Sequence, residues 1–301
     1  MCIRDSDKGV PASIDFKDIT LSEILARTAR NHPDSTAIVF MNMKMSYAEL
    51  KNQVDRFATA LKNMGIKKDG RVAIQLPNLP QTIIACHACQ VLGAQAVMTN
   101  PLYMPREIEH QWHDADVEVA VCADFLYASK VEPMKKKLPA KQYIIASIPE
   151  YLKWPINWIA PLKLKKAKPV PLIAKVEESD TVHKFKKLLD STEPDLPKVD
   201  ISMDDLALLQ YTGGTTGVAK GAMLTQRNLS YNVQQCASWF PDLTHDDVFL
   251  AALPYFHSFG NTICMHLPIF VGSSMVLLPN PRDIPTMMKS LAKHRVTLMP
   301  V

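Results

Sequence analysis

The sequence lacks the features that mark several common classes of protein. Its 301 residues carry 34 basic and 30 acidic side chains, a net charge of +4. This balance, with no long basic run, gives no reason to expect a nucleic-acid partner. The longest uncharged stretch, residues 248–281, is interrupted by prolines, histidines and other polar residues. We therefore expect buried strand and helix there, and no membrane-spanning helix.

The cysteines and the opening residues give no sign of secretion. Six cysteines are scattered along the chain. The start, MCIRDSDKGV, is polar and has no apolar core of the kind that a secretory leader needs. We therefore expect reduced thiols and a cytoplasmic protein. Residues 1–18 are expected to form a disordered or non-native leader.

Helix-like and strand-like segments alternate through the first half of the chain. Thr20 and Glu23 stand at capping-box spacing before apolar residues with helical period, and Ser46 and Glu49 repeat the arrangement. This alternation predicts an α/β fold of layered sheets and helices around a largely parallel sheet. The expected helices fall within 20–33, 45–65, 80–94 and 105–115, and the expected strands within 35–41, 71–76, 95–100 and 117–123.

From residue 143 to residue 197 the pattern breaks into a proline-rich segment. Two tryptophans and five lysines lie between residues 153 and 168. Aromatic and basic residues together could contact anionic lipid. The alternative is a surface connection with snorkelling lysines, which we favour because the prolines prevent one continuous amphipathic helix. We place a boundary near residue 195, with a first α/β subdomain at 19–195 and the start of a second at 196–301.

Four of the ten glycines fall within nine positions, 213–221, beside three threonines and a lysine. Glycine suits close approach of backbone to a ligand, and hydroxyls, backbone N–H groups and lysine bind anions. The pattern predicts a strand at 206–211, a phosphate loop at 212–221, a short strand at 222–225 and a helix from Gln226. The spacing fails the Walker, dinucleotide and kinase glycine-loop patterns. A flexible glycine-threonine linker is the remaining structural alternative.

The loop resembles the signature [ST]-[SG]-G-T-[ST]-G-x-x-K-G of adenylate-forming enzymes. Ala219 stands where that family often has proline. The stretches NPLYMPREIEHQ, LPYFHSFG and NPRDIP extend the resemblance to bacterial long-chain fatty-acid–CoA ligases, from about residue 19 to the end. The matching residues are Thr212, Gly213, Gly214, Thr215, Thr216, Gly217, Lys220 and Gly221.

This resemblance implies an enzyme that joins a fatty acid to ATP as an acyl-adenylate and then transfers it to coenzyme A. It implies that Gly213–Gly217, with the hydroxyls of Thr215 and Thr216, hold the β- and γ-phosphates. Lys220 would neutralise the leaving pyrophosphate, and Thr212 would contact Mg²⁺. Tyr211 and Gly221 would complete the nucleotide site.

The stretch LPYFHSFG implies a second part of the site. Amino-acid-activating relatives often carry an aspartate here, whereas this chain has Phe256, His257 and Ser258, so an apolar acid is favoured. The resemblance implies a catalytic position for His257 near the substrate carboxylate. Either an acyl channel or the core could hold Asn261, Cys264, Met265 and Leu267.

Other histidines and cysteines have weaker functional signals. Cys86, His87 and Cys89 have redox or metal spacing, but they lie inside an expected helix without a second ligand pair, which favours a structural role. His110 and His113 are expected to be surface or packing residues.

The resemblance also implies that a glutamate motif and a mobile C-terminal domain would follow residue 301, so we expect the chain to be a fragment that is inactive alone. A homodimer and peripheral contact with lipid on the inner face of the membrane are further expectations. The alternatives are an adenylating enzyme for another carboxylic acid and a truncated, non-catalytic nucleotide- or lipid-binding module.

Overall fold

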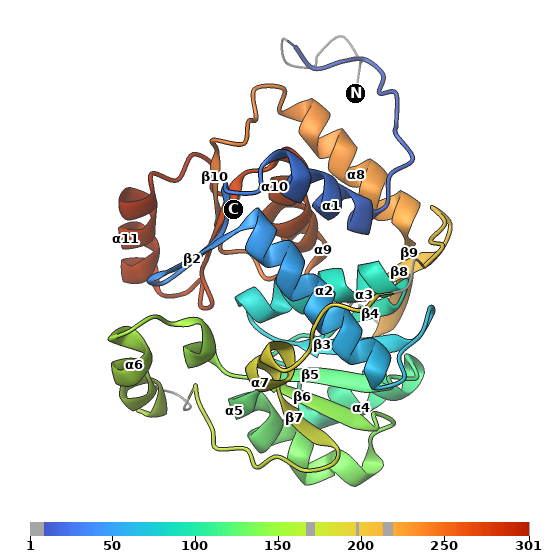
Figure 1. The fold of residues 1–301 in the computed structure, drawn as a ribbon, viewed down its shortest axis with the longest axis vertical. Coiled ribbons are helices and arrows are strands. Elements are labelled where there is room, and N and C mark those ends of the chain that lie inside the picture. Colours follow the sequence, from blue (N-terminus) through green and yellow to red (C-terminus); the bar gives the residue numbers. More distant parts are fainter. Residues whose placement is uncertain (1–8, 167–171, 197–198, 213–218, 301) are drawn as a thin grey trace.

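The computed structural model describes residues 9–166, 172–196, 199–212 and 219–300 (Figure 1). Two sheets organise these residues, one with the strand order β7-β6-β5-β3-β4-β8-β9 and one with the order β10-β11-β1-β2. Neighbouring strands are parallel except in the pairs β8–β9 and β1–β2. The predicted α/β fold with a largely parallel sheet is therefore confirmed.

The strands of the larger sheet are β3 (Arg71–Gln75), β4 (Gln95–Met98), β5 (Val119–Ala123), β6 (Gln142–Ala146), β7 (Val182–Lys184), β8 (Leu206–Thr212) and β9 (Lys220–Thr225). Those of the smaller sheet are β1 (Thr36–Phe40), β2 (Met43–Ser46), β10 (Val248–Ala251) and β11 (Ser274–Leu277). The main helices are α1 (Leu21–Asn31), α2 (Tyr47–Asn63), α3 (Pro80–Leu92), α4 (Pro105–Asp114), α6 (Ile156–Lys165), α7 (Phe185–Asp190), α8 (Gln226–Trp239) and α11 (Ile284–His294). Short helical turns are α5 (Asp124–Leu126), η2 (Tyr127–Val131), η3 (Glu132–Lys137), η4 (Ile148–Tyr151), α9 (Ser258–Asn261), η5 (Thr262–His266) and α10 (Leu267–Val271).

The two predicted capping boxes begin α1 and α2. The backbone N–H of Glu23 donates to the Thr20 hydroxyl, and the Glu23 carboxylate accepts from the Thr20 backbone N–H at 2.8 Å. Ser46 and Glu49 repeat both bonds before α2. Each box satisfies N–H groups that the first helical turn leaves without a backbone partner. The four predicted helices and four predicted strands of the first half are all present.

The proline-rich segment contains more regular structure than the sequence pattern indicated. Strand β6 begins at Gln142 and pairs in parallel with β5 on one side and β7 on the other. The break in the alternating pattern, which we placed at residue 143, therefore lies after this strand; the strand carries no sequence signal because Tyr143–Ala146 is a short buried run without alternation. Helix α6 follows, with Pro161 inside it and no buried residue.

Both sheets combine strands from the two sides of residue 195. Strand β8 pairs with β4, and β11 pairs with β1, although the partners lie far apart in the sequence. The segment around residue 195 thus links strands of shared sheets. The division into two subdomains stays a prediction.

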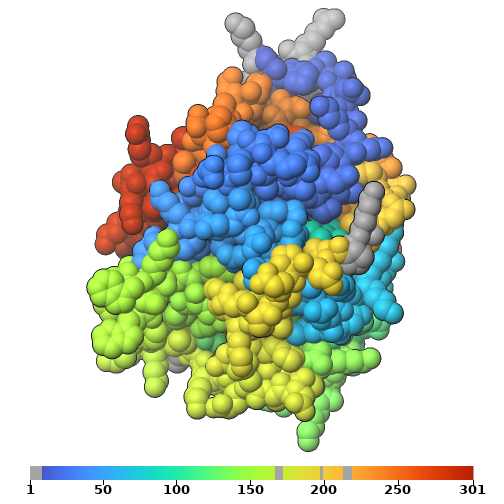
Figure 2. All heavy atoms as spheres, in the orientation of Figure 1, coloured from blue at the N-terminus to red at the C-terminus, as the bar shows by residue number. Residues whose placement is uncertain are grey.

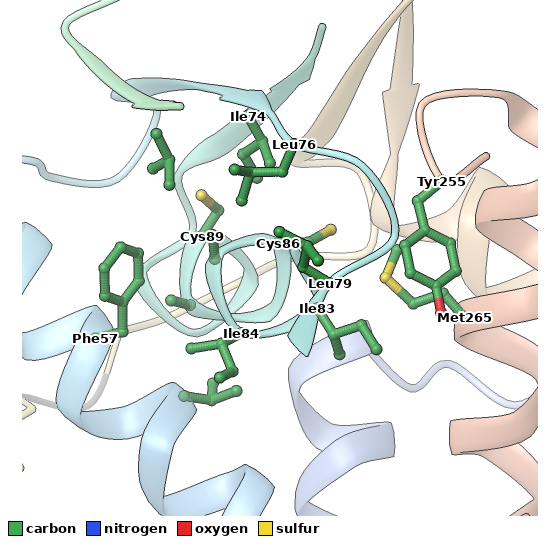
Figure 3. Packing of buried hydrophobic residues seen from close by; sticks show 14 of the residues in the cluster. Phe57, Ile74, Leu76, Leu79, Ile83, Ile84, Cys86, Cys89, Tyr255 and Met265 are labelled. Carbon is green, nitrogen blue, oxygen red and sulfur yellow. The ribbon is translucent and has the colours of Figure 1, made fainter. Parts of the chain in front are cut away.

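Helix α3 lies at the centre of the main core. All of its residues from Pro80 to Leu92 are buried except Val91. Its side chains meet Phe57 of α2 on one side and Tyr255 and Met265 on the other (Figure 3). This packing joins the helices of both sheets into one apolar cluster. None of the described helices combines the length and apolarity needed to cross a membrane.

Candidate active site

Strands β8 and β9 bring the two ends of the predicted phosphate loop together. In this antiparallel pair Tyr211 lies opposite Gly221, and Thr212 lies opposite Lys220. The side chains of Thr212 and Lys220 are both exposed at the end of the hairpin. The predicted strands and the helix beginning at Gln226 are present, with β8 buried as a central strand. The strands extend further than predicted, because their pairing continues through Thr212, Lys220 and Gly221, which were expected in the loop. The predicted phosphate ligands Gly213, Gly214, Thr215, Thr216 and Gly217 lie outside the described residues.

Tyr211 packs closely against Gly221. A Cβ atom added to Gly221 would lie 2.9 Å from two atoms of the Tyr211 ring. The ring has little freedom to move because Tyr211 is buried and its hydroxyl donates to Oδ2 of Asp114 at 2.5 Å. Burial, together with this carboxylate, raises the pKa of the Tyr211 hydroxyl. Glycine at position 221 is therefore required by a close contact between the strands.

Helix α4 contacts both ends of the loop. Asp114 binds Tyr211 at the end of β8, and His110 Nε2 donates to the backbone carbonyl of Ala219 at 3.1 Å. Sequence reasoning placed His110 among surface or packing residues and did not find this contact. His110 and Asp114 are four residues apart, so they lie on the same face of a helix. This spacing is the sequence signal that could have predicted a shared contact.

His257 lies on the segment that faces β8. It is the residue directly before α9, its side chain is exposed, and its ring centroid lies 5.3 Å from that of Phe256. The side-chain amide of Gln210 on β8 donates to the backbone carbonyl of Phe256. The structure therefore links the phosphate-loop strand to the His257 segment through Gln210, which the sequence analysis did not single out.

Two further residues fix the path of the His257 segment. Asn78 donates to the carbonyls of Ala251 and Leu253 at 2.9 and 2.8 Å, and its Oδ1 accepts from the Tyr255 N–H. Gly260 allows a tight turn, because a Cβ atom there would lie 2.3 Å from the Pro254 carbonyl oxygen. Asn78 carries no sequence signal that separates it from other asparagines.

A pocket of about 530 Å³ opens between β8, β9, α8 and α9. Leu208 and Leu224 give it apolar walls, while Gln210, Ser258 and Asn261 give it polar groups on the side of the His257 segment. Of the four residues that were expected to line either an acyl channel or the core, Asn261 lines this pocket. Cys264, Met265 and Leu267 are fully buried.

The cysteine–histidine motif of α3 is buried, and His87 packs edge-on against His266. No group of three or more His, Cys, Asp or Glu side chains suited to a metal ion occurs in the part of the chain that the structure describes. Burial raises the pKa of Cys86 to about 12 and lowers that of His87 to about 4. These shifts favour an uncharged, structural role. Cys86, Cys89, Cys122, Cys236 and Cys264 are free.

The two-sheet α/β fold carries the β8–β9 hairpin beside a pocket that α8 and α9 also line. The chain belongs to the AMP-binding enzyme family, whose model matches residues 25–301. A curated relative, the long-chain-fatty-acid–CoA ligase of Bacillus subtilis strain 168, is 35% identical over 295 residues, which cover 97% of this chain and 51% of that protein. The chain therefore spans about half the length of this relative.

Two solved structures share the fold. A long-chain-fatty-acid–CoA ligase from Archaeoglobus fulgidus has a TM-score of 0.79 at 23% identity, covering 98% of this chain and 54% of that one. An anthranilate–CoA ligase in complex with anthranoyl-AMP has a TM-score of 0.78 at 19% identity, covering 94% and 49%. At these identities the likeness concerns the fold alone.

Proposed function

We propose that this chain carries the ATP- and acid-binding part of a ligase that activates a long-chain fatty acid as an acyl-adenylate and passes it to coenzyme A. The observation that carries the proposal is the hairpin β8–β9, which holds Thr212 opposite Lys220 beside a pocket lined by Ser258 and Asn261. The family and the relative from Bacillus subtilis support it.

In the proposed first step, a carboxylate oxygen of the fatty acid attacks the α-phosphorus of ATP. The new bond joins the carboxylate oxygen to the α-phosphorus as a mixed anhydride, and the bond from the α-phosphorus to the oxygen that bridges to the β-phosphorus breaks, which releases pyrophosphate. Catalysis of such a step is mainly positioning and neutralisation of charge. Lys220 neutralises the leaving pyrophosphate, and the loop 213–217 supplies backbone N–H donors. The close contact of Tyr211 with Gly221 would hold the two strands of the hairpin in register at the nucleotide site.

In the second step the coenzyme A thiol attacks the acyl carbon and displaces AMP. We place His257 beside the acid carboxylate and the adenylate, since its exposed ring lies on the segment that Gln210 ties to β8. The described lining of the pocket consists of three leucines, Arg227 and eight uncharged polar residues, with no carboxylate. Because it offers no carboxylate to pair with an amine, an acid without an amino group fits this lining.

Magnesium ion is expected to accompany ATP, and Thr212 is its proposed contact. Thr212 presents an exposed hydroxyl at the end of the hairpin, and the described residues contain no group of three or more His, Cys, Asp or Glu side chains suited to a metal ion. They do not make a metal site by themselves, so no step is assigned to the metal. A homodimer, a cytoplasmic location and peripheral contact with membrane lipid belong to the same proposal.

The test begins with sequencing the reading frame on both sides of this chain and purifying its longest product. Pyrophosphate release is then measured with palmitate, decanoate, benzoate and anthranilate. The proposal predicts release with the two fatty acids and little with the aryl acids. Release with aryl acids alone would assign another acid, and nucleotide binding without release would favour a non-catalytic module.

A further inference from the structure

Helix α6 presents an apolar surface that the proposed chemistry does not use. The side chains of Trp154 and Trp158 are 81% and 82% exposed, and Leu162 is 68% exposed. Ile159 adds a further exposed apolar group one residue after Trp158. Large apolar side chains gathered on one exposed element mark an interaction surface more often than scattered ones do.

This surface is held in place at its base. Lys153 forms two hydrogen bonds with the side chain of Asn42 in the β1–β2 turn, at 2.9 and 3.1 Å. Just before it, Tyr151 and Leu152 are buried, and Leu164 of α6 packs against the main core. The segment, coloured yellow-green, lies at the periphery of the molecule (Figure 2). Its orientation is therefore set by the fold.

The charge of the segment has one sign. Lys153, Lys163, Lys165 and Lys166 are exposed, and no acidic residue occurs from residue 151 to residue 166. Within the described residues none of these lysines forms a salt bridge. Four cations beside two tryptophans are complementary to an anionic surface with an apolar interior.

We propose that this surface, which we call the α6 surface (residues 153–166), docks on an anionic lipid bilayer. Tryptophan side chains favour the boundary between headgroups and acyl chains, and lysines favour the anionic headgroups. A ten-residue helix is about 15 Å long, too short to span a bilayer, so it lies in the interface. The inference deepens the lipid contact of the proposed function and rests on it for its biological role.

Docking at α6 leaves the β8–β9 hairpin accessible. Helix α6 lies in the connection between β6 and β7, at one edge of the larger sheet, whereas β8 and β9 form the opposite edge (Figure 1). A protein bound through α6 therefore keeps its pocket away from the headgroups. A fatty acid leaving the bilayer would then be activated close to its source.

The test is co-sedimentation of the longest product with phosphatidylcholine vesicles that contain or lack phosphatidylglycerol. We expect binding to the anionic vesicles and little to the neutral ones. The variant K163E/K165E should bind the anionic vesicles at least roughly thirtyfold more weakly, since each lysine near such a surface contributes about fivefold. The variant W154A/W158A should also bind more weakly.

Two control variants distinguish binding through the α6 surface from a general attraction of the protein to anionic vesicles. K136E/K137E changes the net charge equally at exposed positions of η3, and W239A removes an exposed tryptophan of α8. Both should bind like the parent, and thermal melts check that every variant folds. Equal weakening in K136E/K137E, or unchanged binding in both α6 variants, would overturn the proposal.

Pyrophosphate release with soluble decanoate keeps this proposal distinct from the proposed function. The α6 variants should retain that activity because the surface lies away from the hairpin. If the parent protein releases pyrophosphate but does not bind anionic vesicles, the docking surface alone is refuted. Vesicle binding at α6 without release by any fatty acid refutes the ligase proposal alone.

Discussion

His110 and Asp114 lie one turn apart on α4 and hydrogen-bond opposite sides of the hairpin that carries the phosphate loop. His110 holds the Ala219 carbonyl before β9, and Asp114 holds the Tyr211 hydroxyl at the end of β8. Because one helix fixes both sides, α4 sets the separation of the loop ends. These two residues are positioning residues in the proposed site.

Removing the Tyr211 hydroxyl tests this arrangement. We expect Tyr211→Phe to lower the free energy of unfolding by about 1 kcal/mol, the usual net contribution of one hydrogen bond, or somewhat more because Asp114 is charged. Asp114→Asn should cost a similar amount, and the double variant should cost less than the sum, as expected for partners in contact. Urea unfolding of all three variants measures this. Additive costs would show that the pair is not coupled.

A methyl group at position 221 should disturb the hairpin. Gly221→Ala places a Cβ atom 2.9 Å from the Tyr211 ring, so we expect a loss of about 1–3 kcal/mol, as for other overpacked sites. Ala222→Ser, at an exposed position of the same strand, is the matched control. Combining Gly221→Ala with Tyr211→Leu should recover part of the loss. Unfolding free energies that match the control would contradict the close contact.

The buried pair His87 and His266 predicts a loss of stability in acid. Their ring centroids lie 5.2 Å apart, and no hydrogen-bond partner for either ring occurs in the part of the chain described. Burial lowers the pKa of His87 from 6.5 to about 4. For His266, burial and then the neighbouring His87 lower the pKa further. The unfolded chain therefore binds protons that the folded chain excludes.

The pH dependence of the free energy of unfolding that follows from these two histidines has a definite sign. The contribution is fully present above pH 6.5 and is lost as the pH falls toward 4; for His87 alone it amounts to about 3 kcal/mol. Glu150, whose pKa is raised to about 7 by burial, acts in the opposite direction. Urea melts at pH 7.5 and 5.5 should show a smaller difference for His87→Phe than for the parent. His245→Gln, at an exposed position, is the control, and an unchanged difference in His87→Phe would contradict the account.

Local sequence patterns predicted the elements that depend on local physics. The capping boxes at Thr20 and Ser46 determine where helices begin, and the strand–loop–strand order around the glycines follows from turn residues between apolar runs. Strand β6 was missed because Tyr143–Ala146 is short, buried on both faces and followed by prolines. A run of this kind carries no periodic signal.

Contacts between distant segments could not be read from the sequence. The pairing of β8 with β4, the bond from Gln210 to Phe256 and the contact of His110 with Ala219 join positions 46 or more residues apart. They depend on how the sheets assemble, and side-chain type alone does not reveal them. The phosphate-loop prediction rests on glycine, threonine and lysine together, an unusual local combination, and it stays a prediction because residues 213–218 lie outside the described part of the chain.

The most direct test of the central claim is Lys220→Ala in the longest product of the reading frame. The account predicts that pyrophosphate release with palmitate falls at least about a hundredfold, the typical loss when one electrostatic stabiliser is removed. Palmitate binding, measured separately, should stay within about threefold, because Lys220 contacts the phosphates and not the acid. Lys137→Ala is the matched control. Unchanged pyrophosphate release in Lys220→Ala would contradict the role of this lysine and, with it, the proposed nucleotide site.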